Sequence, residues 1–159
     1  MTADRIAIGV VSDTHGLVRP EAIAALRGCD LVLHAGDVGR PEVIDAFREI
    51  APTVAVRGNV DGGAWAEALP LTEVVEAAGH SLYMLHDISE LDLDPAAVGF
   101  AAVIFGHSHR PSAERKDGVL YLNPGSAGPR RFTLPVSVAR ISIEGPALDC
   151  EIVTLDIGA

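Results

Sequence analysis

The sequence predicts one α/β domain spanning residues 1–159, and three observations lead to this prediction. Short apolar runs alternate with helical patterns in the first half, which is typical of parallel strands joined by helices. The second half holds short strand patterns separated by glycine-containing turns. The chain has 159 residues without a repeat, low-complexity stretch or linker, which suits one continuous core.

The first half is predicted to run strand, helix, strand, helix, strand. The expected strands are residues 6–11, 31–33 and 53–56. One helix is expected from Pro20 to a stop at Gly28, and another from Pro41 to Ile50. Such alternation implies right-handed crossovers and a largely parallel sheet.

The second half is predicted to be rich in β-structure. The expected strand pairs are 72–76 with 81–85, 112–116 with 119–122, and 136–143 with 148–155. Asp117-Gly118 is a strong hairpin signal for the middle pair. Asp94-Pro95 should begin a short helix that ends at Gly99, before a buried strand at residues 101–105.

The charge balance argues against extended nucleic acid as a partner. The chain has 12 Lys and Arg against 22 Asp and Glu, a formal net charge of −10. A small phosphate ester is still compatible, because bound cations can invert the local field. We also expect no membrane association, a cytoplasmic location, and two reduced thiols at Cys29 and Cys150.

Clusters of Asp, His or Asn side chains follow five of the predicted strands. These residues are Asp13 and His15, His34 and Asp37, Asn59 and Asp61, His86 and Asp87, and His107 and His109. Because the ends of parallel strands meet at one edge of a sheet, we expect these side chains to lie together. Carboxylate oxygens and imidazole nitrogens suit first-row divalent metals, so a metal site is predicted there.

The order of these motifs resembles the calcineurin-like metallophosphoesterase superfamily. The pattern runs Asp13-x-His15, Gly36-Asp37, Gly58-Asn59-x-Asp61, a lone His86 and Gly106-His107-x-His109. Asn123-Pro124-Gly125-Ser126 adds a likeness to the small single-domain phosphodiesterases of that superfamily. The resemblance extends from about Ile6 to Arg130.

The resemblance implies a four-layer α/β/β/α sandwich and a site for two divalent metal ions. Asp13, His15, Asp37 and His109 would hold the first ion; Asp37 would bridge to the second, with Asn59, His86 and His107. Asp37, Asn59 and His107 are also predicted to act in catalysis. Mn²⁺ is the expected metal, with Ni²⁺, Fe²⁺, Co²⁺ or Zn²⁺ as alternatives.

The implied reaction is hydrolysis of a small phosphate ester, and a phosphodiester is the expected substrate. Two cations roughly 3.5–4 Å apart would share a hydroxide that attacks phosphorus in line. Val60 departs from the family pattern, because many members have His there, which would steady the transition state or protonate the leaving group. Ile88 departs as well, since close relatives often have a second His two places after His86.

Other readings stay open at several residues. We interpret His34 as a brace for a ligand, His80 as a solvent-facing turn residue, and Asp61 and Asp87 as turn residues rather than ligands. Asn123-Pro124-Gly125-Ser126 fits either an ordinary type II turn or a turn bordering the site. Arg130 and Arg131 fit either a phosphate contact or a solvated patch.

Two functions compete with the phosphoesterase. The first is a catalytically weak scaffold of the same fold that binds protein partners, and the second is a nuclease. The complete ligand set argues against the scaffold, and the shortage of basic residues argues against the nuclease. A homo-oligomer is compatible with the strand-rich second half.

Overall fold

Two five-stranded sheets dominate the computed structural model, which describes residues 5–158. The first sheet has the order β10-β9-β1-β2-β3, and its strands β1, β2 and β3 are parallel. Strands β9 and β10 add an antiparallel pair to the other side of β1. Its bounds are β1 (Arg5–Val11), β2 (Leu31–His34), β3 (Thr53–Ala55), β9 (Ser137–Glu144) and β10 (Ala147–Thr154).

The second sheet has the order β4-β5-β6-β8-β7. Strands β5, β6 and β8 are parallel, and β4 and β7 close the two sides as antiparallel partners. The predicted hairpins are therefore confirmed in this sheet. Its bounds are β4 (Thr72–Ala77), β5 (His80–Leu85), β6 (Ala102–Ile104), β7 (Ser112–Lys116) and β8 (Val119–Asn123).

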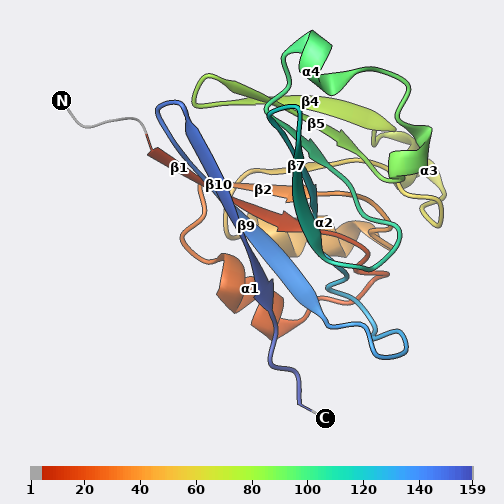
Figure 1. Cartoon of the computed structure of the whole chain (residues 1–159). Helices are drawn as coiled ribbons and strands as arrows, with labels where there is room; N and C mark the ends of the chain where they lie inside the picture. Colours follow the sequence, from red (N-terminus) through yellow and green to blue (C-terminus); the bar gives the residue numbers. More distant parts are fainter. Residues whose placement is uncertain (1–4, 159) are drawn as a thin grey trace.

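The main hydrophobic core lies between the two sheets. Ile8 and Leu33 of the first sheet and Leu82, Ile104 and Leu120 of the second belong to one buried cluster. The sheets therefore pack face to face, as Figure 1 shows. Among residues 5–158, no helix is long and apolar enough to cross a membrane.

Helices form the two outer layers, and the layers differ in thickness. Phe47, Leu26 and Val43 of α1 (Pro20–Leu26) and α2 (Pro41–Arg48) pack in a second cluster on the outer face of the first sheet. The second sheet is covered by η1 (Ile88–Glu90), α4 (Pro95–Val98) and their connection. The expected four-layer α/β/β/α arrangement is confirmed, with one layer much thinner than the other.

Several predicted boundaries need correction. The first helix ends at Leu26 with Arg27 as its C-cap, so Gly28 (φ 84°) follows the helix end as predicted, whereas the second helix ends at Arg48 rather than Ile50. The one-turn helix α3 (Ala64–Glu67) was not predicted, because its N-cap residue is Gly63 and no side chain caps it. The 3₁₀ turn η1 was also missed as a helix.

The ligand-bearing strands do not share one sheet, contrary to the expectation. Loops after β1, β2 and β3 come from the first sheet, whereas those after β5 and β6 come from the second. Because the sheets are stacked with these strand ends at the same end of the sandwich, the loops still meet.

Candidate metal centre

The structure brings six of the seven predicted ligands into two groups. The first group is Asp13, His15 and His109, and the second group is Asp37, His86 and His107. Within each group, one possible ligand atom from every residue lies within 4.8 Å of the others. Each group joins loops from both sheets.

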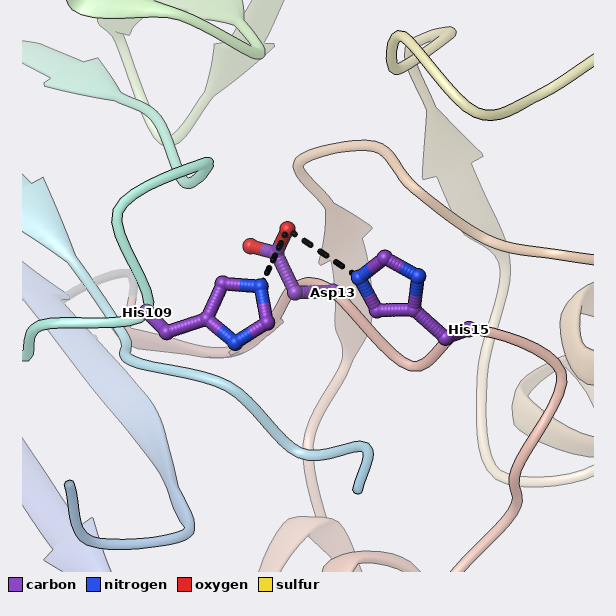
Figure 2. A group of neighbouring side chains, drawn as sticks. All are labelled: Asp13, His15 and His109. Carbon is purple, nitrogen blue, oxygen red and sulfur yellow. Dashed lines mark ion pairs between the residues drawn. The ribbon is translucent and has the colours of Figure 1, made fainter. Parts of the chain in front are cut away.

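The first group converges on one oxygen of Asp13. Its Oδ1 lies 3.3 Å from His109 Nε2 and 3.8 Å from His15 Nε2, as Figure 2 shows. The other oxygen, Oδ2, accepts hydrogen bonds from Ser12 Oγ at 2.7 Å and from the His107 backbone N–H at 3.0 Å. The protein thus holds one edge of the carboxylate and leaves Oδ1 free of hydrogen bonds.

The second group converges on Asp37 Oδ2. His86 Nε2 lies 3.2 Å away, while the other ring nitrogen, Nδ1, is 2.8 Å from the Ala35 carbonyl oxygen. That carbonyl can only accept, so Nδ1 is protonated and Nε2 is the free nitrogen of the neutral ring. Asp37 Oδ1 accepts from the Val60 backbone N–H at 3.0 Å.

Asp37 also reaches the first group. Its Oδ2 lies 3.7 Å from His15 Nε2 as well as 3.2 Å from His86 Nε2. This oxygen therefore faces a nitrogen from each group. The placement agrees with the predicted bridging position, while the bridging role itself stays a prediction.

A divalent cation fits the chemistry of these donors. Asp13 Oδ1, His15 Nε2 and His86 Nε2 are buried and have no hydrogen-bond partner. Buried polar atoms normally find partners, and a neutral imidazole nitrogen facing a carboxylate oxygen leaves two lone pairs opposed. A cation between such atoms would satisfy them together, and N/O donor sets of this kind suit first-row metals.

The pKa shifts of Asp37 and His86 in the second group also favour a bound cation. Burial alone would raise the pKa of Asp37, but the close approach of His86 and the hydrogen bond from the Val60 amide lower it to about 2. Burial alone would lower the pKa of His86, but Asp37 and the Asp13 charge outweigh it and raise that pKa. Both pKa shifts show that the second group favours a positive charge beside the Asp37 carboxylate.

Backbone geometry at the centre is unusual. Five predicted ligands have a positive φ although none is glycine: Asp13 (55°), His15 (47°), Asp37 (55°), His107 (72°) and His109 (63°). Non-glycine residues rarely adopt this left-handed conformation, and such strain persists where the surrounding structure enforces it. The loops are therefore built to aim these side chains inward.

His34 supports the loops from beneath, as its interpretation as a brace proposed. It is fully buried, and burial lowers its pKa to about 4. Nδ1 accepts from the Gly36 N–H at 3.1 Å, so Nε2 carries the proton and donates to Thr14 Oγ1 at 2.9 Å. Thr14 Oγ1 donates in turn to the Val38 carbonyl at 2.9 Å, which links the 13–15 loop to the 36–38 loop.

Asp61 is a turn residue with a wider reach than expected. Its carboxylate accepts from the Gly58 N–H at 2.9 Å, from Val38 at 3.2 Å and from Gly39 at 2.9 Å. It therefore ties the loop of Asn59 to the loop of Asp37. Asn59 itself is exposed and lines a cavity beside His86, where its ligand role stays a prediction.

Asp87 combines the expected turn role with proximity to the centre. Its carboxylate caps η1 through the Ser89 N–H, at 3.0 Å. The other oxygen lies 3.8 Å from His107 Nε2, so Asp87 borders the second group. His80 begins β5 rather than lying in a turn, and its Nε2 is 2.8 Å from the Gly145 carbonyl oxygen.

The Asn123-Pro124-Gly125-Ser126 turn does border the centre. Gly125 has a φ of 81°, and Ser126 Oγ donates to the Asp13 carbonyl at 3.1 Å. Arg130 and Arg131 are exposed. The supporting hydroxyls of Ser12, Thr14 and Ser126 were missed from the sequence, since isolated serines and threonines carry no distinguishing pattern.

Comparisons with known proteins agree with this arrangement. Residues 6–145 match the calcineurin-like phosphoesterase superfamily domain. The chain is 34% identical to a probable metallophosphoesterase of Methanothermobacter thermautotrophicus over 158 residues, covering 92% of this chain and 91% of the relative.

Solved structures with the same fold include enzymes and a sorting protein. A structure described as a novel archaeal phosphodiesterase superposes with a TM-score of 0.76 and 25% identity, covering 93% of this chain and 100% of that one. Vacuolar Protein Sorting 29 from Cryptosporidium parvum gives a TM-score of 0.83 at 19% identity, covering 98% and 94%. The second likeness concerns the fold alone.

Proposed function

Because the chain belongs to the calcineurin-like phosphoesterase superfamily, we propose that it is a dinuclear metal-dependent phosphodiesterase acting on small phosphate esters. One observation carries the proposal. Asp37 Oδ2 faces His15 Nε2 and His86 Nε2, one nitrogen from each ligand group, and both nitrogens are buried without hydrogen-bond partners. This arrangement suits two neighbouring cations that share one carboxylate.

Divalent ions bound there would lower the pKa of a bound water toward roughly 7 and neutralise phosphoryl charge. The chain's own contribution is to fix the donors in advance. Ser12 and the His107 amide hold Asp13, the Val60 amide holds Asp37, and the Ala35 carbonyl orients His86. Asn59 and His107 are exposed to solvent and are the proposed catalytic partners of Asp37.

Mn²⁺ is the proposed metal, since mixed carboxylate, amide and imidazole donors accept it readily. Ni²⁺, Fe²⁺, Co²⁺ and Zn²⁺ accept the same donors. Metal identity is decided by reconstituting chelator-stripped protein with each ion. Measured metal content and hydrolysis together rank the ions.

Val60 makes the leaving group important. A leaving-group acid is worth roughly 10²–10⁴-fold, and Val60 offers no proton. Aryl phosphodiesters, whose leaving groups need little protonation, are therefore the proposed better substrates. Equal rate constants for matched aryl and alkyl diesters would contradict this bias.

The direct test is a screen of metals against substrates. Stripped protein receives each ion together with bis(p-nitrophenyl) phosphate or p-nitrophenyl phosphate, and released nitrophenolate is measured. We expect metal-dependent turnover, faster on the diester. Silence in every combination would favour a scaffold of this fold, for which protein partners would then be sought.

Three further expectations belong to this proposal. The substrate is a small ester rather than nucleic acid or membrane lipid, which competition by DNA or vesicles tests. Two unpaired cysteines, Cys29 and Cys150, favour a reducing compartment such as the cytoplasm, which cell fractionation tests. Self-association is decided by light scattering of the purified chain.

A further inference from the structure

A cavity of about 490 Å³ opens beside the second ligand group. Asn59 and His86 line it, whereas no residue of the first group does. It therefore extends from the second group away from the first. Its volume is in the range of small-molecule sites and exceeds what one phosphoryl group needs. The cavity has room for the part of a substrate that lies beyond the phosphorus.

Arg57 is the one arginine or lysine among the residues lining this cavity. Its Nε is buried and has no hydrogen-bond partner. Among residues 5–158, arginine–carboxylate ion pairs involve Arg5 and Arg48 but not Arg57. This guanidinium thus stands at the cavity without an anion.

Four other arginines donate side-chain hydrogen bonds to backbone carbonyl oxygens, whereas within residues 5–158 Arg27, Arg110, Arg130 and Arg131 resemble Arg57 in having neither such a bond nor an ion pair. Arg19, Arg40 and Arg140 donate to the carbonyl oxygens of Gly128, Gly16 and Ala25 respectively. Arg115 likewise donates to the Leu148 carbonyl. Because Nε is enclosed, a ligand in the cavity would meet the accessible part of half-buried Arg57 rather than Nε, and Arg57 is the arginine that the cavity offers to such a ligand.

Acidic residues at the same cavity do not fill this role. Glu90 and Asp92 are exposed to solvent, where their charges are screened. Asp87 Oδ1 is occupied by the Ser89 N–H and hydroxyl. The acids disfavour an anion near the rim, so an anion is favoured only at Arg57.

We propose that this cavity takes the alcohol portion of the phosphate ester and that Arg57 binds a second oxyanion carried by that portion. The inference rests on the proposed function, since it needs the scissile phosphoryl group at the two ligand groups. A guanidinium offers paired N–H donors that match the two oxygens of a carboxylate or phosphoryl group. The substrate class is therefore a phosphate ester whose alcohol is itself acidic.

The test compares two matched, non-hydrolysable ligands by calorimetry on manganese-loaded protein. 2-Carboxyethylphosphonate and propylphosphonate share the phosphonate head and differ in the terminal carboxylate. A charge-assisted hydrogen bond predicts that the carboxylated ligand has a roughly tenfold or greater lower Kd. Ethylenediphosphonate, measured the same way, distinguishes a phosphoryl from a carboxylate second anion.

Variants assign the preference to Arg57. Arg57→Gln should bind 2-carboxyethylphosphonate and propylphosphonate equally, and Arg57→Lys should keep a reduced preference because it retains a point charge. Arg48→Gln removes one positive charge from α2 and should behave as the unmodified protein. Circular dichroism confirms that each variant is folded.

The outcomes separate this inference from the proposed function. Equal Kd values in the unmodified protein, no binding of either phosphonate, or a preference that survives Arg57→Gln would overturn the Arg57 subsite. Hydrolysis of bis(p-nitrophenyl) phosphate by the unmodified protein judges the proposed function independently. Should Arg57→Gln not fold, the ligand pair on the unmodified protein and on Arg57→Lys still decides.

Discussion

The two ligand groups contain the same types of donor, one Asp and two His, but differ in solvent exposure. Two residues of each group are buried, and the third is the half-buried His15 in the first group and His107, with a 42% exposed side chain, in the second. The buried His34–Thr14 network ties the 13–15 loop of the first group to the 36–38 loop, whereas Asp61 supports the 36–39 and 58–61 segments by accepting from backbone amides nearer the surface. A buried, braced group should hold an ion firmly, and an open one should exchange ion and admit substrate.

The largest expected effect falls on the residue that both groups share. Asp37→Asn keeps an acceptor for the Val60 amide and tolerates the positive φ, but it removes the charge. We expect roughly 10³-fold or greater loss of diesterase activity, since several kcal/mol of charge stabilisation disappears. Nitrophenolate release and metal content measure it, with the surface variant Asp45→Asn as control. Near-normal rates would remove the bridging role.

The structural role of the buried His34–Thr14 network can be tested by measuring stability as the pH is lowered. The pKa of His34 is about 4 in the folded protein against an ordinary 6.5, so the unfolded chain takes up this proton first. Stability should therefore fall between pH 6.5 and pH 4, by roughly 3 kcal/mol from this residue.

Urea unfolding of metal-free protein across that pH window measures the effect. His34→Gln should lack this part of the pH dependence, and His80→Gln, at a part-exposed histidine, should retain it. An identical slope in unmodified protein and His34→Gln would contradict the role given to the buried ring.

Loss of the support around the second group should cost less than loss of the charge on Asp37. Asp61→Ala frees the amides of Gly58, Val38 and Gly39 and loosens the loop of Asn59 against that of Asp37. Loss of such outer support typically costs 10–100-fold in metal affinity or activity. Manganese titration should show the loss in the weaker binding step. A uniform loss in both steps would blur the distinction between the groups.

The smallest expected effect is a difference in ion release. With graded chelator, the ion at the second group should leave first, and His107→Ala should hold about one ion per chain, from the two proposed. His109→Ala should disturb the tighter step instead. Elemental analysis after dialysis reads out both. Release in the reverse order would show that exposure of His107 does not control retention.

Much of the fold followed from sequence because its signals were local. Apolar runs marked β1, β2 and β6, Pro20 and Pro41 marked helix starts, and Asp117-Gly118 marked the β7–β8 hairpin. Helix α3 carried no such signal, since Gly62-Gly63 precedes it and no side chain caps it. Short elements fixed by tertiary contacts leave little trace in a local pattern.

The candidate centre divided along similar lines. The types and order of the candidate ligands could be predicted from the sequence. The structure then places Asp13, His15 and His109 in one group and Asp37, His86 and His107 in another. The sequence did not reveal that two stacked sheets contribute to the centre, because a local strand pattern does not show to which sheet the strand belongs. The positive φ at His15, His107 and His109 was also hidden, since histidine is no marker of that conformation.

The division of each ligand group between the sheets has a mechanical consequence. A cation held by Asp13 and His109 would cross-link the two sheets, because those residues follow β1 of the first sheet and β6 of the second. Separation of the sheets on unfolding would then require release of the cation. The free energy of unfolding should therefore rise with the concentration of free metal, by about 2.7 kcal/mol at a hundred times the Kd.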